Sequence, residues 1–369
     1  MGGYLNLIIA DEDEKFINIA KAACESISDI HLMGIARSEG MLMAKVRNSR
    51  PDLILMDITS GLGGVQILDA LKRTDPDLNI IIVCRPGTHS SDILVSALEM
   101  GAMECMEKPE SMVSRRFSEF RLNLLTITGL LTARKRFGGK TRPESSSAGY
   151  RNKFFMPVKS SDSLKTRGLK TGRYAGTIKI VVIASSTGGP EILSRIFSLL
   201  PADLKVPVLL VQHIPAVMTG YFAKSLNEKS ELDVFQAGHG DEILPGRVYV
   251  APGGQHMIVS RPDDRGIRRI MLNHNPPVNS VRPSADILFE SVADSYQGNI
   301  LAIVLTGMGE DGKRGVAAMK KKGCICISQN PETCVVYGMP RSVDQAGLSD
   351  ESLDPLSITQ KIVALAQAR

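Results

Sequence analysis

Residues 178–200, IKIVVIASSTGGPEILSRIFSLL, determine how the C-terminal half of the chain is expected to fold. The β-branched run at 178–183 predicts a strand buried on both faces of a parallel sheet. Gly188 and Gly189 permit a tight turn, and Pro190 suits the first position of a helix because it has no N–H to leave unpaired. Apolar residues at helical spacing follow, so the stretch predicts a strand, a turn and a helix.

Two serines, Ser185 and Ser186, lie where this strand ends. Unpaired N–H groups and the positive end of a helix dipole are expected beside them. Such an environment suits a nucleophile or a phosphate site, and a serine that only caps the helix would have the same sequence. The stretch by itself leaves these three interpretations open.

Length and composition describe a globular chain of more than one domain. A chain of 369 residues is expected to form two or three domains. No apolar run approaches the roughly 18 residues that a membrane span needs, so we expect no membrane-spanning segment. The N-terminal residues lead directly into a strand rather than a signal peptide, and the six cysteines are scattered without a C-x-x-C pair. These features predict a cytoplasmic protein without structural zinc.

The positive charge is concentrated in one segment. Residues 134–173 hold twelve Lys or Arg and two acids, a balance of 12 − 2 = +10, whereas the whole chain carries +5. This segment is poor in core-forming residues, which is typical of a flexible charged linker. We therefore predict a first domain at 1–131, a basic linker at 132–176 and a second domain at 177–369. A solvated tether, or a contact with an acidic partner, fits the linker better than a nucleic-acid contact, because no folded reader accompanies it.

The first domain alternates strand and helix patterns, as in a doubly wound α/β fold with a parallel sheet. Strands are expected at Leu5–Ala10, Leu53–Met56, Ile80–Val83 and Met103–Met106. The carboxyl ends of parallel strands share one edge of the sheet, where ligands bind. Charged residues follow three of these strands, namely Asp11, Glu12, Asp57 and Lys108. Three carboxylates and one amine at that edge predict a site for a hard cation.

On these residues the first domain resembles a response-regulator receiver. The resemblance implies that Asp11, Glu12 and Asp57 bind Mg²⁺, that Asp57 accepts the phosphoryl group, and that Lys108 contacts it. The chain departs from the family at Cys84, which stands where a switch Ser or Thr is usual. A thiol is a weak hydrogen-bond donor, so the relay of the phosphorylation signal is in question.

Three strands of the second domain are expected to bring polar residues to one sheet edge. The strands at 178–183, Val206–Val211 and Ile300–Leu305 are followed by the serine pair, by His213 and by Asp311. A serine becomes a nucleophile when a histidine accepts its proton, and a carboxylate orients that histidine. Of the six histidines, only His213 directly follows a buried strand.

A dinucleotide site is the competing interpretation, because Gly307, Gly309 and Gly312 match the G-x-G-x-x-G fingerprint after a strand. Glu310 and Asp311 would repel a pyrophosphate there. The next strand, at 324–328, ends in Gln329 and so offers no acid to bind a ribose.

Five motifs of the second domain together resemble the chemotaxis protein-glutamate methylesterase family. They are STGGP (186–190), QHIP (212–215), VYVAPGGQHM (248–257), PPVNSVRPSAD (276–286) and LTGMGEDG (305–312). The resemblance implies a second doubly wound, Rossmann-like sheet and the catalytic triad Ser186, His213 and Asp311. It also implies an oxyanion donor at the backbone of Met308, a supporting contact from Thr187, and a structural His256.

This resemblance further implies the reaction and the partners. The expected activity is hydrolysis of glutamyl methyl esters on chemoreceptors, together with deamidation of glutamines, and without a cofactor for the esterase. A chemotaxis histidine kinase is the expected phosphodonor, and the receiver is expected to cover the catalytic edge until it is phosphorylated. Two alternatives remain at this point: a non-catalytic adaptor, and an esterase of the same chemistry in a non-chemotaxis sensory array.

Overall fold

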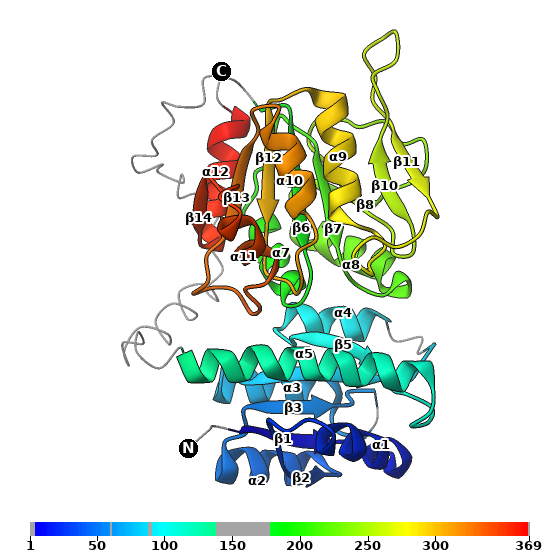
Figure 1. Ribbon diagram of the computed structural model, residues 1–369, viewed down its shortest axis with the longest axis vertical. Coiled ribbons are helices and arrows are strands. Elements are labelled where there is room, and N and C mark those ends of the chain that lie inside the picture. Colours follow the sequence, from blue (N-terminus) through cyan, green and yellow to red (C-terminus); the bar gives the residue numbers. More distant parts are fainter. Residues whose placement is uncertain (1–3, 60, 88–90, 138–177, 368–369) are drawn as a thin grey trace. The chain divides into compact units, whose positions relative to one another are not determined.

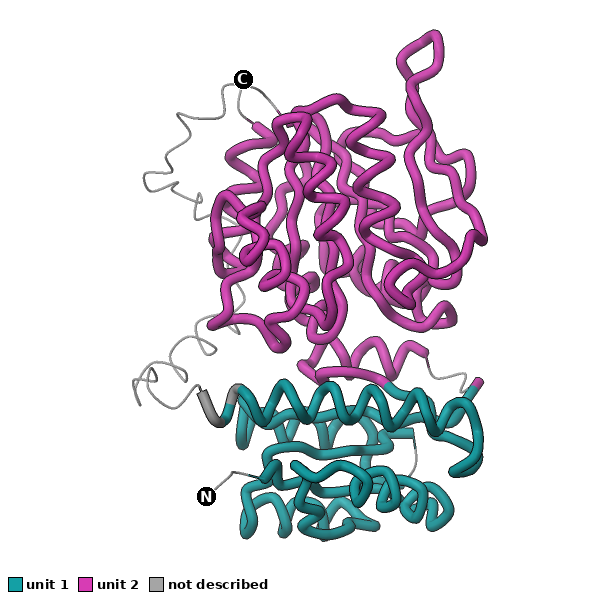
Figure 2. Tube along the Cα trace, in the orientation of Figure 1, with its two compact units in different colours: residues 1–86, 106–168 teal, residues 87–105, 169–369 magenta. Residues whose placement is uncertain are grey.

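The computed structural model describes residues 4–59, 61–87, 91–137 and 178–367. The chain forms two compact units, one of residues 1–86 and 106–168 and the other of residues 87–105 and 169–369 (Figure 2). The predicted linker lies outside the described residues, apart from positions 132–137. No helix in the described part of the chain is long and apolar enough to cross a membrane.

The N-terminal elements form the predicted doubly wound fold around a five-stranded sheet of order β2-β1-β3-β4-β5 (Figure 1). Strand β1 pairs in parallel with β2 and β3, and β3 pairs in parallel with β4. The elements are β1 (Leu5–Ala10), α1 (Glu14–Glu25), β2 (Ile30–Ala36), α2 (Glu39–Ser49), β3 (Leu53–Met56), α3 (Gly64–Thr74), β4 (Asn79–Cys84), α4 (Ser91–Glu99), β5 (Glu104–Glu107) and α5 (Arg115–Phe137). The four strands expected from sequence are confirmed to within about a residue.

A seven-stranded sheet of order β14-β13-β12-β6-β7-β9-β8 forms the core of the second fold. Its first four strands in the chain are β6 (Ile180–Ser185), β7 (Val208–Gln212), β8 (Asp233–Gln236) and β9 (Arg247–Val250). After them come β12 (Ile300–Val304), β13 (Ile325–Gln329) and β14 (Glu351–Leu353). All six pairings between neighbouring strands are parallel. The residues of β6, β7 and β12 are all buried, which explains why these strands show no polar alternation in sequence.

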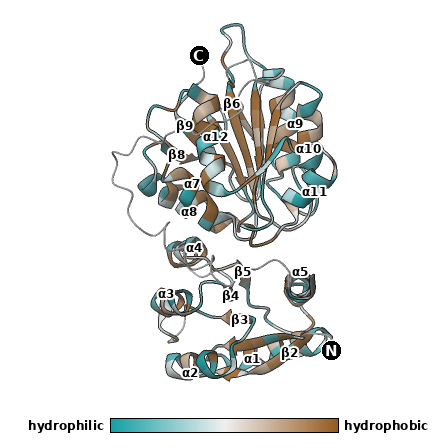
Figure 3. Ribbon diagram, turned by 90° about the vertical axis from the view of Figure 1, so that its left-hand side faces the viewer, coloured by the Kyte–Doolittle hydropathy of each residue, from teal (hydrophilic) through white to brown (hydrophobic). Residues whose placement is uncertain are grey.

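Helices cover both faces of this sheet (Figure 3). One layer contains α9 (Ala285–Tyr296), α10 (Lys313–Lys320) and α11 (Met339–Gln345), and the other contains α7 (Gly189–Phe197), α8 (Ala216–Lys229) and α12 (Pro355–Gln367). A separate antiparallel pair, β10 (His256–Val259) and β11 (Ile270–Asn273), lies beside α9. The predicted second doubly wound domain is therefore confirmed.

Strand β6 marks the point where the strand order reverses, because β7 pairs with one of its sides and β12 with the other. The register aligns Ser185 with Gln212, and Ala184 with Val304. In open parallel sheets, ligands bind at such a switch point, beyond the carboxyl ends of the strands. The ends of β6, β7 and β12 meet there, as the sequence predicted.

Candidate active site

The two serines after β6 have different environments. Ser185 is fully buried, and its hydroxyl donates a hydrogen bond to Gln212 Oε1. Ser186 is partly exposed, and its N–H donates to Thr306 O at 3.0 Å. A nucleophile must reach substrate, so the exposure of the two residues favours Ser186, the serine that the family resemblance selects.

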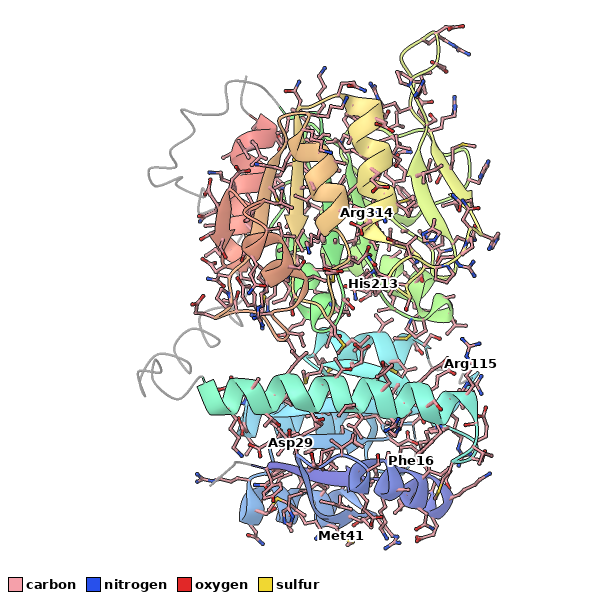
Figure 4. All side chains as sticks on the ribbon, viewed as in Figure 1. Phe16, Asp29, Met41, Arg115, His213 and Arg314 are labelled. Atoms are coloured by element: carbon pink, nitrogen blue, oxygen red, sulfur yellow. The ribbon has the colours of Figure 1, made fainter. Side chains whose placement is uncertain are left out.

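His213 follows β7 and lies at the same edge (Figure 4). Its backbone N–H donates to Ser185 O at 3.0 Å, which fixes the loop beside the serines. On the side chain, Nε2 lies 2.9 Å from Asp311 Oδ2. The predicted histidine and aspartate are thus in hydrogen-bonding contact, although 98 residues separate them.

Asp311 is buried and accepts hydrogen bonds at both carboxylate oxygens. Ser284 Oγ at 2.7 Å and Asp286 N at 3.1 Å donate to Oδ1, and Ala285 N at 2.7 Å donates to Oδ2 beside His213. The carboxylate therefore occupies the N-terminus of α9, where the helix dipole favours negative charge. Burial alone would raise the pKa of Asp311, but the hydrogen bonds and charge of His213, with the bonds from Ser284 and Ala285, hold it below its usual value.

An ionised carboxylate can only accept hydrogen bonds, so His213 Nε2 carries the proton of this contact. The Nδ1 nitrogen is then the one with a free lone pair, and it is the atom available to act as a base. Within the described residues, no hydrogen bond joins Ser186 Oγ to the His213 ring. Catalytic hydrogen bonds are often loose without substrate, and the two residues remain neighbours at one sheet edge.

Two backbone N–H groups near Ser186 form no hydrogen bond to any described residue, those of Thr187 and Met308. The N–H groups of Gly188 and Gly189 are occupied, by Met103 O at 3.0 Å and Ser186 O at 2.7 Å. The start of α7 therefore offers fewer oxyanion donors than the sequence suggested, whereas the Met308 N–H predicted from the family resemblance is available. The Thr187 N–H was not anticipated, although the residue after a nucleophile commonly supplies such a donor.

The Thr187 hydroxyl is engaged by a residue from the 87–105 segment of the same unit. It donates to Glu104 Oε2 at 2.6 Å, and burial raises the pKa of Glu104 despite this bond and one from Cys105 N. Glu99 in the same segment accepts bonds from the hydroxyls of Ser194 and Ser225 and from the Lys229 ammonium. The supporting hydroxyl predicted at Thr187 is thus turned toward a carboxylate.

The acids and the lysine of the receiver edge also come together. Lys108 Nζ lies 2.5 Å from Asp57 Oδ2 and 2.7 Å from Asp11 Oδ2, and all three residues are buried. Asp57 Oδ1 accepts bonds from the N–H and hydroxyl of Thr59, each at 2.6 Å. Glu12 is exposed, and in the described parts of the chain no three Asp, Glu, His or Cys side chains lie close enough to hold a metal ion.

Asp11 nevertheless offers a ligand atom for a cation. Its Oδ2 is buried, and its cationic neighbour among the described residues is the Lys108 ammonium, which lies 2.7 Å away and also contacts Asp57. A buried carboxylate oxygen without a donor is costly unless a charged partner satisfies it. Asp11 and Asp57 bring to this edge two carboxylates of the kind that a hard cation such as Mg²⁺ prefers, whereas Glu12 does not lie close enough in the described structure to complete the predicted set of three.

None of the other described histidines contacts Ser186, His213 or Asp311. His31, His239 and His274 are exposed, and His89 falls outside the described residues. His256 is buried; its Nδ1 accepts from Ser284 N at 3.2 Å, and its Nε2 contacts Pro276 O at 3.0 Å. Sequence reasoning missed Ser284 and Gln212 because their roles depend on partners 27 residues distant.

Comparison with known proteins shows the family to which the chain belongs. The family model described as "CheB methylesterase" matches residues 181–362, and that described as "Response regulator receiver domain" matches residues 7–114. A protein-glutamate methylesterase/protein-glutamine glutaminase of Desulfotalea psychrophila is 34% identical over 360 residues, or 97% of this chain and 98% of the relative. A similarly named protein of Caulobacter vibrioides is 36% identical over 323 residues, 87% of this chain and 88% of the relative.

One solved structure is similar to the second unit. The crystal structure of the Thermotoga maritima CheB methylesterase catalytic domain superposes with a TM-score of 0.50 and 39% identity, covering 52% of this chain and all of that domain. The two family models match residues 7–114 and 181–362, and the relative from Desulfotalea psychrophila aligns with 97% of the chain. The chain belongs to the CheB methylesterase family of hydrolases that carry a response-regulator receiver domain.

Proposed function

We propose that this chain hydrolyses glutamyl methyl esters on chemoreceptors, and deamidates glutamines there, through Ser186, His213 and Asp311. The observation that carries the proposal is the 2.9 Å contact between His213 Nε2 and Asp311 Oδ2 at the sheet edge that also holds Ser186. The names of the relatives, which couple a methylesterase with a glutaminase, support the same pair of reactions.

In this mechanism Ser186 Oγ attacks the ester carbonyl while His213 Nδ1 takes its proton. Nδ1 then protonates the departing methoxide, so methanol leaves and an acyl-serine remains. Water attacks the acyl group as Nδ1 removes its proton, and the same proton returns to Ser186 Oγ as the glutamate is released. Asp311 holds the ring and stabilises its charged form throughout.

The tetrahedral intermediates carry an oxyanion that the backbone can stabilise. The N–H groups of Met308 and Thr187 have no other partner among the described residues, and they flank Ser186. One preorganised donor of this kind contributes roughly 3–4 kcal/mol to the transition state. We assign the oxyanion to these two groups, with no cofactor for the esterase.

The receiver is proposed to take a phosphoryl group from a chemotaxis histidine kinase at Asp57. Mg²⁺ held by Asp11, Glu12 and Asp57 would offset negative charge on the incoming group. Lys108, already within 2.5 Å of Asp57 Oδ2, would then contact the phosphoryl oxygens. Cys84 is buried at the end of β4 and is a weak donor, so transmission of the signal is the step to test.

Regulation is proposed to act through residues 87–105, which group with the catalytic fold. Glu104 holds the Thr187 hydroxyl beside the nucleophile, and Glu99 accepts bonds from α7 and α8. Phosphorylation at Asp57 would release these contacts and uncover the edge. The domain limits 1–131, 132–176 and 177–369 and a cytoplasmic location remain predictions that accompany this proposal.

Methanol release from membranes containing methylated receptor tests the proposal on the full-length protein. We expect Ser186→Ala to lower the rate by at least about a thousandfold, because the nucleophile is lost. Ser185→Ala is the matched control, since its hydroxyl is buried against Gln212. Retained activity in Ser186→Ala would reject the triad, and an inactive wild type would favour the adaptor alternative.

A second arm of the assay tests regulation. A small phosphodonor should raise the rate of the wild type and leave that of Asp57→Asn unchanged. An equal rate for the wild type with and without phosphodonor would mean that the receiver does not control the esterase.

A further inference from the structure

We propose that Ser284, held in place by His256, is a positioning residue that fixes the Asp311 carboxylate against His213. The inference rests on the proposed function, because it concerns how the same triad is held. Ser284 touches neither His213 nor Ser186 in any described contact, so it would act only through Asp311.

Ser284 does not behave as an ordinary N-cap residue. It precedes the first turn of α9 with extended backbone angles, yet its side chain makes no capping bond to its own helix. An N-cap serine usually accepts a bond from an N–H of the first turn. Here the Asp311 carboxylate accepts from Ala285 N and Asp286 N instead, and the Ser284 hydroxyl donates to the same carboxylate at 2.7 Å.

Because the Ser284 hydroxyl donates to Asp311 and does not cap its own helix, it can orient the Asp311 carboxylate. The Ser284 bond to Oδ1 is shorter than the 3.1 Å bond from Asp286 N to the same oxygen. It occupies Oδ1 and thereby leaves Oδ2 to face His213 Nε2. Ser284 is fully buried, so the hydroxyl is shielded from solvent and a lost bond is poorly replaced.

His256 fixes the backbone of Ser284 from the opposite side. The carbonyl of Pro276 can only accept, so His256 Nε2 carries a proton, and Nδ1 is left with the lone pair that accepts the Ser284 N–H. His256 is 1% exposed, and its contacts define a single neutral tautomer. The buried His256 is thus connected to His213 through Ser284 and Asp311.

Loss of the Ser284 hydroxyl should have two separable effects. The carboxylate would be held less firmly, so kcat would fall while KM would hardly change, because Ser284 does not contact substrate. The carboxylate would also share less of its charge with a donor, and would therefore hold the protonated His213 ring more strongly. The acidic limb of the pH profile of kcat/KM should then move to higher pH.

The other charged groups near this carboxylate and ring do not change in such a variant. Asp286 and Arg314 act electrostatically on Asp311, and Glu104 and His213 act on each other. We expect their positions to be unchanged, because the described bond of the Ser284 hydroxyl goes to Asp311 and not to any other of these side chains. A shift of the acidic limb in Ser284→Ala therefore reports on the Ser284 to Asp311 bond.

The test compares full-length Ser284→Ala and Ser284→Cys with the wild type in the methanol-release assay. We expect kcat to fall by about ten- to a hundredfold in both, with KM within twofold and the acidic limb moved upward. Cysteine has nearly the shape of serine but is a weak hydrogen-bond donor. Ser284→Cys therefore removes most of the hydrogen bond without leaving a cavity. It also replaces Ser284→Ala as the test if the alanine variant does not fold.

Ser295→Ala is the matched control. Ser295 is also buried on α9, and its hydroxyl donates to Ser260 O at 2.8 Å, away from Asp311. We expect it to keep kcat and the pH profile. A kcat within twofold of wild type with an unmoved acidic limb in the Ser284 variants would overturn the inference. Ser186→Ala is measured alongside; if it stays active, the triad itself fails, which is a different outcome from an inert Ser284.

Discussion

Two carboxylate clusters lie at the carboxyl ends of parallel strands in this chain. Different groups balance the negative charge of each cluster. In the receiver, Asp11 and Asp57 share one buried ammonium, from Lys108 at 2.7 and 2.5 Å. In the catalytic fold, Asp311 receives a hydrogen bond from each of four donors, and only His213 among them can carry a charge.

The pKa shifts of Asp11 and Asp311 indicate what keeps a buried carboxylate ionised. Burial is the largest influence on both Asp11 and Asp311, and it favours the protonated form. The pKa of Asp11 is raised, because Lys108 and the Asp13 N–H only partly offset burial and Asp57 adds repulsion. The pKa of Asp311 is lowered, because the hydrogen bond and the charge of His213, together with the bonds from Ser284 and Ala285, outweigh burial. Asp311 has a charged partner and further donors of its own, whereas Asp11 shares its ammonium with a second carboxylate.

We expect the largest loss of kcat from a substitution that disturbs the hydrogen bonds to Asp311. In Asp311→Asn, the amide group would present N–H donors to a site that already contains four donors. His213 would lose the acceptor that fixes its tautomer, and kcat should fall by roughly 10³–10⁴-fold. Methanol release by full-length protein measures this.

Asp286→Asn is the control for that substitution, because it makes the same chemical change at a neighbouring buried carboxyl. Asp286 accepts bonds from Gly315 N and Asn279 rather than from His213. A kcat for Asp311→Asn that is no lower than for Asp286→Asn would show that the donors around Asp311 are structural.

The next prediction concerns the free energy of unfolding when the ammonium shared by Asp11 and Asp57 is removed. Lys108→Met leaves two buried carboxylates without their cation, so the free energy of unfolding should fall by about 3–5 kcal/mol at neutral pH. Lys361→Met is the comparison, because Lys361 is equally buried but its partner Glu351 is 30% exposed and can be hydrated. Urea unfolding of the two variants should therefore rank Lys108→Met as the larger loss, and the reverse ranking would contradict it.

A single added methyl group tests how rigid each site is. A Cβ at Gly307 would lie 2.8 Å from Ser186 Cβ and 2.5 Å from Met339 Sδ, so Ser186 and Met339 would have to move. A Cβ at Gly61 would meet only the far end of the Glu12 side chain, 2.5 Å from Oε1. We expect Gly307→Ala to lower kcat by about ten- to a hundredfold, and Gly61→Ala to change receiver phosphorylation by less than about twofold.

The same substitution, glycine to alanine, is measured by a different assay at each site. Methanol release reports on Gly307→Ala, and the rate of phosphorylation by a small phosphodonor reports on Gly61→Ala. Equal sensitivity of the two sites would mean that the receiver loop is as firmly packed as the catalytic edge.

The sequence predicted most of the receiver cluster, although the structure does not bring Glu12 close enough to Asp11 and Asp57 to complete the predicted set. Its charges stand directly after the strands, at Asp11, Asp57 and Lys108, so strand topology alone brings them together. His213 and Asp311 were found in the same way. Gly188, Gly189 and Pro190 also predicted the turn and the start of α7 correctly.

The donors that hold Asp311 were beyond the reach of the sequence. They come from the start of α9, and Ser284 there looks like an ordinary helix cap in the motif RPSAD. That Asp311 replaces it as the capping acceptor depends on how α9 and α10 pack, which no local pattern encodes. The contact between Thr187 and Glu104 was missed for a similar reason, because it joins residues 83 positions apart.

The smallest expected effect follows from the opposite pKa shifts of the two acids. Because the pKa of Asp11 is raised in the folded state, the native state loses stability as the pH rises from the usual carboxyl value of 3.8 through the folded-state pKa, and the loss is complete above it. Asp11→Asn should therefore be slightly more stable than the wild type at pH 7 in a metal chelator. The gain should disappear below the usual carboxyl pKa of 3.8, where Asp11 is protonated in both states.

Asp311→Asn should show the opposite sign. The lowered pKa of Asp311 contributes stability above 3.8, and this is lost as the pH falls through the folded-state pKa, so the asparagine variant should be less stable at pH 7 and approach the wild type in acid. Thermal unfolding of both variants from pH 3 to pH 8 compares the two curves. Curves of the same sign would mean that burial, and not the number of directed donors, governs both carboxylates.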